Sequence, residues 1–209
     1  FDGKKLRRLN LSEIGQIAGR AGRYLNDGGF GITGDCKEIS PEEVELLENH
    51  KFEEIRTLFW RNSNLNFNNP TSLIKSLEEK PHVEWLRKIH ECEDEKALKY
   101  FLKDQKILNR GFDKKILMLL WECCQIPDFV KKTYGNHFEV IGNVFKFLTS
   151  KKGLISEDYM RLQLMKLDKL DGNVDSLSNR IANVRTWSYV SNKNNWVENQ
   201  SYWIEKTKH

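Results

Sequence analysis

The sequence predicts a mainly helical protein that opens with a short α/β segment. From residue 40 onward, apolar residues recur at helical spacing almost throughout the chain. Residues 1–39 are instead rich in glycine and basic residues, with one helical stripe and one strand-like stretch. No unit of about 20 to 50 residues repeats, so a helical solenoid is not expected. The predicted domains are therefore residues 1–39 and residues 40–209.

The opening segment is expected to contain one helix and one strand. The helical stripe consists of Ile14, Ile17, Ala18 and Ala21. This spacing predicts a helix that begins near Ser12 and ends near Gly22. The glycine-flanked residues 29–33 read as a short strand, which cannot satisfy its own backbone groups. We therefore expect this segment to be the end of a larger α/β domain.

The rest of the chain is expected to form one irregular helical domain. Its first helix follows Ser40, because Pro41 suits a first helical position and Glu43 completes a capping box. Further helices are expected at residues 52–60, 71–79, 83–90, 94–103, 113–124, 138–149, 157–170, 174–190 and 200–206. Proline and glycine residues separate most of these segments.

Bulk composition excludes some classes of protein. The hydrophobic share of 39% and the charged share of 31% are typical of a globular chain. No apolar run approaches the roughly 18 residues that span a bilayer, so no membrane partner is expected. The four cysteines lack the spacing of a zinc knuckle, and the five histidines show no metal spacing; we expect reduced thiols and no metal ligands. The net charge of +4 permits a polyanionic partner without requiring one.

The string from Gln16 to Arg23 carries the clearest chemical signal. Residues three and four apart share a helix face, so Gln16, Arg20 and Arg23 can converge on one point. Gly19 and Gly22 are expected to leave that face open. Paired guanidiniums offer planar, permanently charged donors that suit a triphosphate. The alternative is a basic helix of small residues that makes surface salt bridges.

The full string Gln-Ile-Ala-Gly-Arg-Ala-Gly-Arg at residues 16–23 resembles motif VI of superfamily-two helicases. In that superfamily the motif faces ATP across the cleft between two RecA-like domains. The resemblance implies that Gln16 contacts the phosphate end of the nucleotide and that Arg20 and Arg23 are catalytic arginine fingers. Gln16, Gly19, Arg20 and Arg23 would then be the cofactor-binding residues, and residues 1–39 the end of a second RecA-like domain.

Later stretches, at residues 59–62, 120–122, 125–129 and 180–187, resemble bacterial relatives of the mitochondrial degradosome RNA helicase, a DExH-type enzyme. The resemblance implies an ATP-dependent RNA helicase, hence an NTP hydrolase, whose helical C-terminal domain guides single-stranded RNA. It also implies ATP and Mg²⁺ as cofactors, single-stranded or partly duplex RNA as a partner, and an exoribonuclease as a further partner. A bacterial cytoplasm is the expected location, with a mitochondrial matrix as the alternative.

The chain departs from that family because it has no phosphate-binding P-loop, and Asp94–Ala97 is not a DExH box. Its first residue is Phe1 rather than a methionine. We therefore expect a C-terminal fragment that alone binds neither ATP nor Mg²⁺, hydrolyses no ATP and unwinds nothing. The alternative is a non-catalytic helical RNA-binding or protein-docking module that retains motif VI as a relic.

The best candidates for RNA contact lie near the C-terminus, where basic and aromatic residues alternate. Arg185 and Lys193 are candidates for phosphate contacts. Trp187 is expected to pack in the core or between domains, because one helical face runs beside it. The basic residues at positions 4–8 are interpreted as part of a solvated loop. Contact with phosphate is the alternative interpretation. The glycines at positions 29–34 spell a dinucleotide-binding fingerprint, but no strand precedes them and no helix follows.

Overall fold

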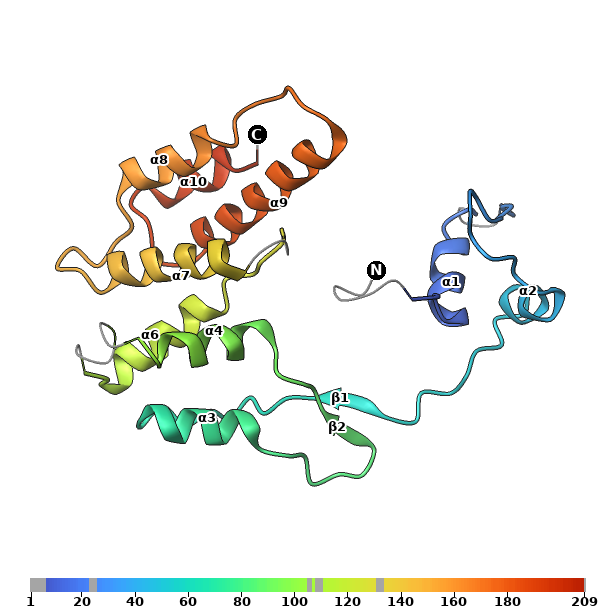
Figure 1. Ribbon diagram of the computed structural model, residues 1–209, viewed down its shortest axis with the longest axis horizontal. Helices are drawn as coiled ribbons and strands as arrows, with labels where there is room; N and C mark the ends of the chain where they lie inside the picture. The colour runs from blue at the N-terminus through green and yellow to red at the C-terminus, as the bar shows by residue number, and fades with distance from the viewer. Residues whose placement is uncertain (1–6, 23–25, 105–106, 108–110, 131–133, 209) are drawn as a thin grey trace. The chain divides into compact units, whose positions relative to one another are not determined.

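A computed structural model describes residues 7–22, 26–104, 107, 111–130 and 134–208. The chain divides into two compact units, unit 1 over Phe1–Leu58 and unit 2 over Phe59–His209. The predicted boundary at residues 39 and 40 thus falls inside unit 1. Helices dominate the described residues, as Figure 1 shows, and the mainly helical prediction is confirmed.

Unit 1 contains two short helices, α1 (Leu11–Ala18) and α2 (Pro41–Glu48), which contact each other. Both begin with a capping box, in which Asn10 and Ser40 each accept a hydrogen bond from the backbone three residues on. Among the described residues of unit 1 only Leu47 is buried. A core this small cannot offset much conformational entropy, so unit 1 has little stability of its own.

The strand expected at residues 29–33 does not form, and this part of the prediction is wrong. These residues have no regular structure and are exposed, Phe30 and Ile32 included. The physical reason is that an unpaired strand leaves its backbone N–H and C=O groups without hydrogen-bond partners. Glycines at 28, 29, 31 and 34 add conformational entropy that a strand would have to overcome.

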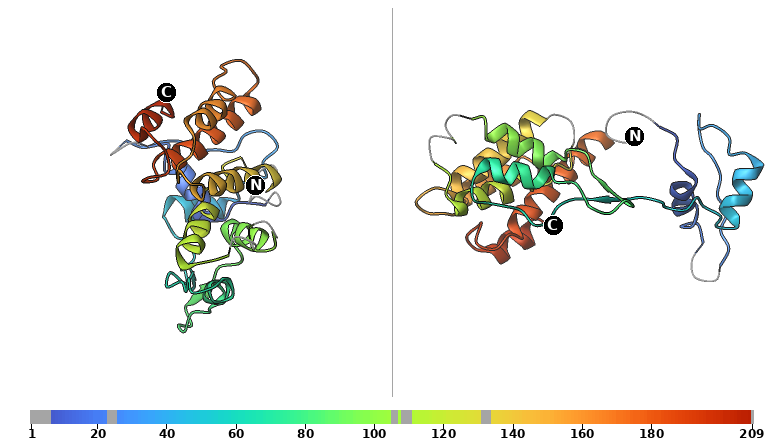
Figure 2. Two further views of the ribbon diagram at one scale, coloured as in Figure 1. Left: turned by 90° about the vertical axis from the view of Figure 1, so that its left-hand side faces the viewer. Right: turned by 90° about the horizontal axis from the view of Figure 1, so that it is seen from below.

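Unit 2 is a helical body. Its described helices are α3 (Pro70–Glu78), α4 (Glu93–Phe101), α6 (Lys114–Cys124), α7 (Tyr134–Leu148), α8 (Glu157–Met165), α9 (Val174–Ser191) and α10 (Gln200–Lys206). Helix α6 packs between α4 and α7, and α9 packs on α10 (Figures 1 and 2). One continuous apolar core includes Leu98, Leu120, Ile141 and Trp203. A parallel bridge between Ile155 and Val197 ties the start of α8 to the segment before α10.

Two predicted helices, at residues 52–60 and 83–90, are wrong. The chain instead forms two short strands, β1 (Leu58–Trp60) and β2 (Leu86–Lys88), which pair in parallel. The Trp60 carbonyl accepts a hydrogen bond of 2.9 Å from the Ile89 backbone. Aromatic residues such as those of Leu-Phe-Trp in β1 suit a strand, and neither segment has a cap to begin a helix.

Arg61, which follows β1, links the small sheet to the helical body. Its guanidinium donates two hydrogen bonds to Asp94, of 2.8 and 3.0 Å, and its Nη2 lies 3.4 Å from Glu95 Oε1. The same group lies 5.2 Å from the ring centre of Trp121 on α6. Arg61 thereby connects the end of β1 to both α4 and α6.

Along the part of the chain that the structure describes, no helix has the length and apolar character needed to cross a membrane.

Candidate nucleotide and nucleic-acid contacts

The residues of the motif VI-like string lie at the end of α1. The helix ends at Ala18, earlier than the predicted end near Gly22. The backbone continues in a tighter turn, because Arg20 donates to Ile17 at 3.1 Å and Ala21 donates to Ala18 at 2.9 Å. A short C-terminal turn of this kind often closes an α-helix.

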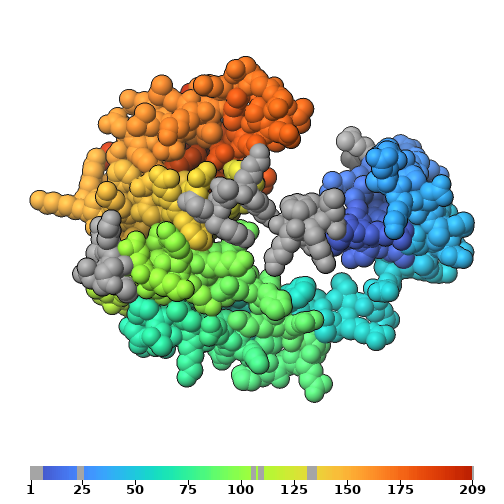
Figure 3. Space-filling model, viewed as in Figure 1, coloured from blue at the N-terminus to red at the C-terminus, as the bar shows by residue number. Residues whose placement is uncertain are grey.

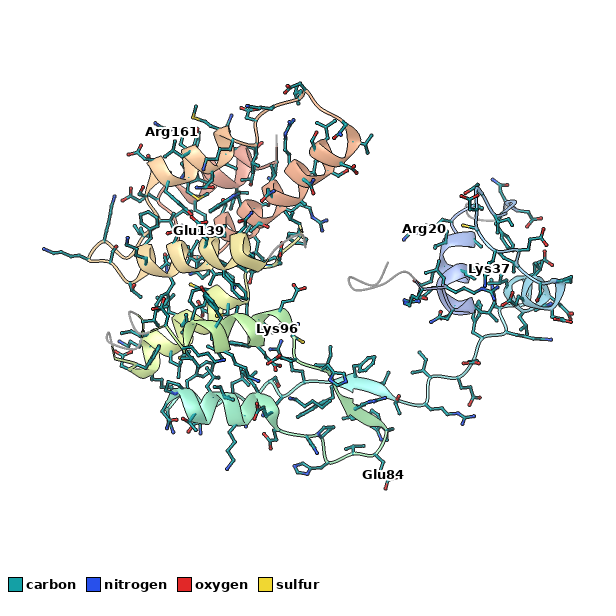
Figure 4. The ribbon with its side chains drawn as sticks, viewed as in Figure 1. Arg20, Lys37, Glu84, Lys96, Glu139 and Arg161 are labelled. Carbon is teal, nitrogen blue, oxygen red and sulfur yellow. The ribbon has the colours of Figure 1, made fainter. Side chains whose placement is uncertain are left out.

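Gln16 and Arg20 are both exposed. Figure 4 shows Arg20 on the side of α1 that is turned away from α2. Within the described residues, its guanidinium has no ion-pair or hydrogen-bond partner. An exposed guanidinium with its donors unused can accept a phosphate without first breaking an internal contact. Arg23, the other predicted arginine finger, lies outside the described residues.

Of the two glycines of the string, Gly22 does not leave a helix face open as expected. A Cβ atom built at Gly22 would lie 2.6 Å from the Asn26 carbonyl oxygen, a contact that no side chain tolerates. A Cβ at Gly19 would lie 3.1 Å from the Gly15 carbonyl oxygen, a close contact that requires a small shift of the neighbouring backbone. The space at Gly22 is therefore filled by backbone, so this glycine permits a close turn instead of leaving a face open.

The basic residues before α1 are engaged in ion pairs. Arg7 donates two hydrogen bonds to Glu13, of 2.6 and 2.7 Å, and Arg8 donates one of 2.6 Å to Glu43 on α2. Lys4 and Lys5 lie outside the described residues. A phosphate could reach Arg7 or Arg8 only by displacing a carboxylate. Arg20 is the more accessible cation in this part of unit 1.

The Arg7–Glu13 pair predicts a pH dependence for α1. The hydrogen bond from Arg7, with help from the Asn10 backbone, lowers the pKa of Glu13 from its ordinary 4.5 to about 2. Stabilisation from this carboxylate is therefore complete above pH 4.5 and is lost as the pH falls toward 2. We expect the ¹³Cα shifts of α1 to move toward coil values across this window.

Glu13→Gln is the control for this prediction, because glutamine keeps the capping geometry but does not titrate. The same loss of helical shifts in Glu13→Gln would show that another group causes it.

Arg185 is exposed on α9, with its guanidinium carbon 4.2 Å from the ring centre of Phe129. The neighbouring Thr186 donates a hydrogen bond of 3.2 Å to the Pro127 carbonyl, which holds the segment before Phe129 against α9. Stacking fixes one face of the guanidinium and leaves its edge for other partners. Arg185 is thus a pre-oriented cation on the surface of unit 2.

Lys193 occupies a different environment. It is partly buried just beyond α9, and its ammonium nitrogen lies 5.1 Å from the ring centre of Tyr189 and 5.8 Å from that of Trp196. Its backbone carbonyl accepts a hydrogen bond from Gln200 on α10. Lys193 therefore contributes to packing between α9 and α10, and only part of its side chain is open to a ligand.

Trp187 is buried with 3% of its surface exposed and meets the Tyr159 ring edge-on at 5.8 Å, which confirms its predicted place in the core. Cys123 and Cys124 are free and buried, and burial raises the pKa of both thiols. They pack as small apolar side chains. In the described residues no group of three metal-binding side chains comes together.

Sequence reasoning missed two exposed aromatic residues near the small sheet, because both fell in segments predicted as helices. Phe59 on β1 is 75% exposed, and Trp85 just before β2 is 55% exposed. The apolar run ending at Trp60 is compatible with a strand, but a run this short is equally compatible with a helix. Exposure itself could not have been read from this pattern.

No protein-family model, curated protein or solved structure matches this chain.

Proposed function

We propose that this chain is the C-terminal part of an ATP-dependent RNA helicase of the DExH type. In this proposal unit 1 belongs to the end of a second RecA-like domain, and unit 2 guides single-stranded RNA. The carrying observation is Arg20, an exposed arginine with unused donors within the motif VI-like string. Gln16 precedes it by four residues and lies on α1, while Arg20 lies in the turn that closes the helix.

The chemistry assigned to Arg20 is charge stabilisation during transfer of the γ-phosphoryl group to water. A guanidinium held against the phosphoryl oxygens stabilises the negative charge that they carry in the transition state. Its donors fit phosphate oxygens, and its charge does not depend on pH in the physiological range. Gln16 would add an amide donor at the same end of the nucleotide, while Mg²⁺ and the phosphate cradle would be held by the remainder of the enzyme.

The distribution of charge supports an RNA-facing role for unit 2. This unit holds 25 of the 34 basic residues and 19 of the 30 acidic residues, which leaves it a net charge of +6. Arg185 adds an oriented cation on its surface. A positive surface with accessible arginines attracts a phosphate backbone regardless of base sequence.

The runner-up function is a non-catalytic helical RNA-binding or docking module. The positive charge of unit 2 favours it equally, since RNA binding needs no ATP. The two functions differ in what Arg20 does. A helicase requires Arg20 for turnover, whereas a binding module does not.

For the chain alone we predict RNA binding without ATP hydrolysis. Single-stranded RNA should bind with an affinity that falls as salt rises, and no ATP turnover should occur at any RNA concentration.

Arg185→Ala should lower the salt slope of RNA binding by about one, because one phosphate contact is lost. Lys193→Ala should instead lower the unfolding midpoint, since its side chain packs on two rings. Fluorescence anisotropy over a salt series and urea denaturation measure these effects; an unchanged salt slope in Arg185→Ala would contradict the first.

A further inference from the structure

The two-stranded sheet of unit 2 has an exposed face to which the proposed function assigns no role. In a parallel pair, the hydrogen bond from the Ile89 N–H to the Trp60 carbonyl places Phe59 directly opposite Arg87. Paired residues of parallel strands point to the same side of the sheet. Both residues are exposed, whereas Leu86 and Lys88 on β2 are partly covered. Phe59 and Arg87 therefore share one open face.

Trp85 lies close to this face along the chain. It is 55% exposed and stands two residues before Arg87, in the turn that leads into β2. A turn closed by the hydrogen bond of 3.0 Å from the Leu86 N–H to the Val83 carbonyl precedes β2 and fixes the backbone there. In the view of Figure 3 the segments of β1 and β2 lie at the edge of the helical body, and no helix of unit 2 covers them on that side.

The charge on this surface is positive. Among the described residues Arg87 has no ion-pair or hydrogen-bond partner. The neighbouring acidic residue is Glu84, and Figure 4 shows its side chain at the tip of the loop, extending away from the two strands. Two exposed aromatic side chains beside an unpaired guanidinium match the needs of a base and its phosphate.

We propose that Phe59, Trp85 and Arg87 form a stacking platform for single-stranded RNA. Phe59 and Trp85 would each stack on a base, and Arg87 would contact the phosphate between neighbouring nucleotides. This inference rests on the proposed function only in taking RNA as the ligand, and it requires neither ATP nor motif VI. An aromatic ring can stack on any base, so the platform would bind single-stranded RNA regardless of its sequence.

The test uses the whole chain and a fluorescein-labelled uridine oligomer of about 12 nucleotides, a length within the usual range of single-strand sites. Phe59→Ala should weaken binding by roughly five- to a hundredfold, the effect of losing one stacked base. Phe59→Tyr should retain the affinity, because the ring remains. Arg87→Ala should weaken binding and lower the salt slope by about one.

Tyr202→Ala is the matched control, because Tyr202 is 56% exposed on α10, away from the sheet. It should leave RNA affinity unchanged. Bound RNA should also quench tryptophan fluorescence, and Trp85→Phe should remove that quenching while retaining most of the affinity. Circular dichroism and the unfolding midpoint should stay at wild-type values in all these variants, since the altered side chains are exposed.

Three results would overturn the platform. One is that the chain binds no RNA, and another is that Phe59→Ala and Arg87→Ala both bind as tightly as wild type. The third is that Phe59→Ala abolishes self-association while RNA affinity is unchanged, which would show that the face meets a protein strand. The second and third results leave the helicase proposal standing, because that proposal depends on turnover and on Arg20.

Discussion

Arg20→Ala should lower RNA-stimulated ATP turnover of the proposed full-length helicase by about three to five orders of magnitude. The variant loses an exposed guanidinium that has no ion-pair or hydrogen-bond partner among the described residues, so removing it disturbs no contact within them. RNA affinity should stay within a few fold of wild type, since the arginine acts on the nucleotide. Turnover is measured by phosphate release at saturating RNA, and affinity by anisotropy. The string predicts the same result for Arg23→Ala.

Two further variants sharpen this prediction. Arg20→Lys retains the charge but loses the planar set of donors, so it should restore little of the activity. Arg161→Ala is the control, because Arg161 is an exposed arginine on α8 whose nearest acid, Asp158, lies 3.9 Å away. Its turnover should equal that of wild type. Wild-type turnover in both Arg20→Ala and Arg23→Ala would refute the arginine-finger role.

Arg61→Met should have the second large effect, lowering the free energy of unfolding of unit 2 by about 3 kcal/mol. The substitution leaves Asp94 without its two hydrogen bonds and leaves Glu95, with 2% of its surface exposed, as an uncompensated buried charge. Combining it with Glu95→Gln should recover part of the loss. Urea denaturation of the whole chain measures these differences.

Lys99→Met, on the helix α4 that carries Asp94 and Glu95, is the control for Arg61→Met. Lys99 forms ion pairs with Glu78 and Glu91, but all three side chains are well exposed. Exposed pairs of this kind contribute about 0 to 1 kcal/mol, so the control should change little. Equal losses of unfolding free energy in Arg61→Met and Lys99→Met would show that burial does not increase the contribution of the Arg61 ion pairs to stability.

Glu95 also gives unit 2 a pH dependence. Burial raises the pKa of this carboxyl above its ordinary 4.5, and the charge of Arg61 offsets only part of that effect. A raised pKa in the folded state means that folding holds the proton more tightly. The contribution of Glu95 to stability is therefore largest below pH 4.5 and declines as the pH rises above it. Glu95→Gln should remove this decline.

Much of the helical body could be predicted from the sequence, because its signals are local. Asp113, Ser156 and Asn173 cap helices that begin at the next residue. The apolar stripes of the first two helices are buried, whereas the helix after Asn173 exposes Ile181 and buries Trp187 and Val190 instead. The strands at 58–60 and 86–88 could not be placed this way. Their partners are far apart in the chain, and short apolar runs do not distinguish a strand from a helix.

The candidate site was only partly predictable. Residue identity alone indicated that Gln16 and Arg20 could share a face, but not that α1 would end at Ala18. The role of Gly22 depends on the Asn26 carbonyl, a contact set by the path of the turn. The stacking of Lys193 on Tyr189 and Trp196 likewise depends on how α9 ends. In each case tertiary contacts decide what the side chain can reach.

The central claim is that Arg20 contacts the phosphates of ATP. Its most direct test is modification of the intact enzyme by an arginine-specific dicarbonyl reagent, with each site followed by mass spectrometry. Arg20 should react readily in the free enzyme, because it is exposed and has no partner in the part of the chain that the structure describes, and should be protected when a magnesium-bound ATP analogue is present. Arg161 should react equally under both conditions. Equal reaction of Arg20 with and without a bound nucleotide would contradict the claim.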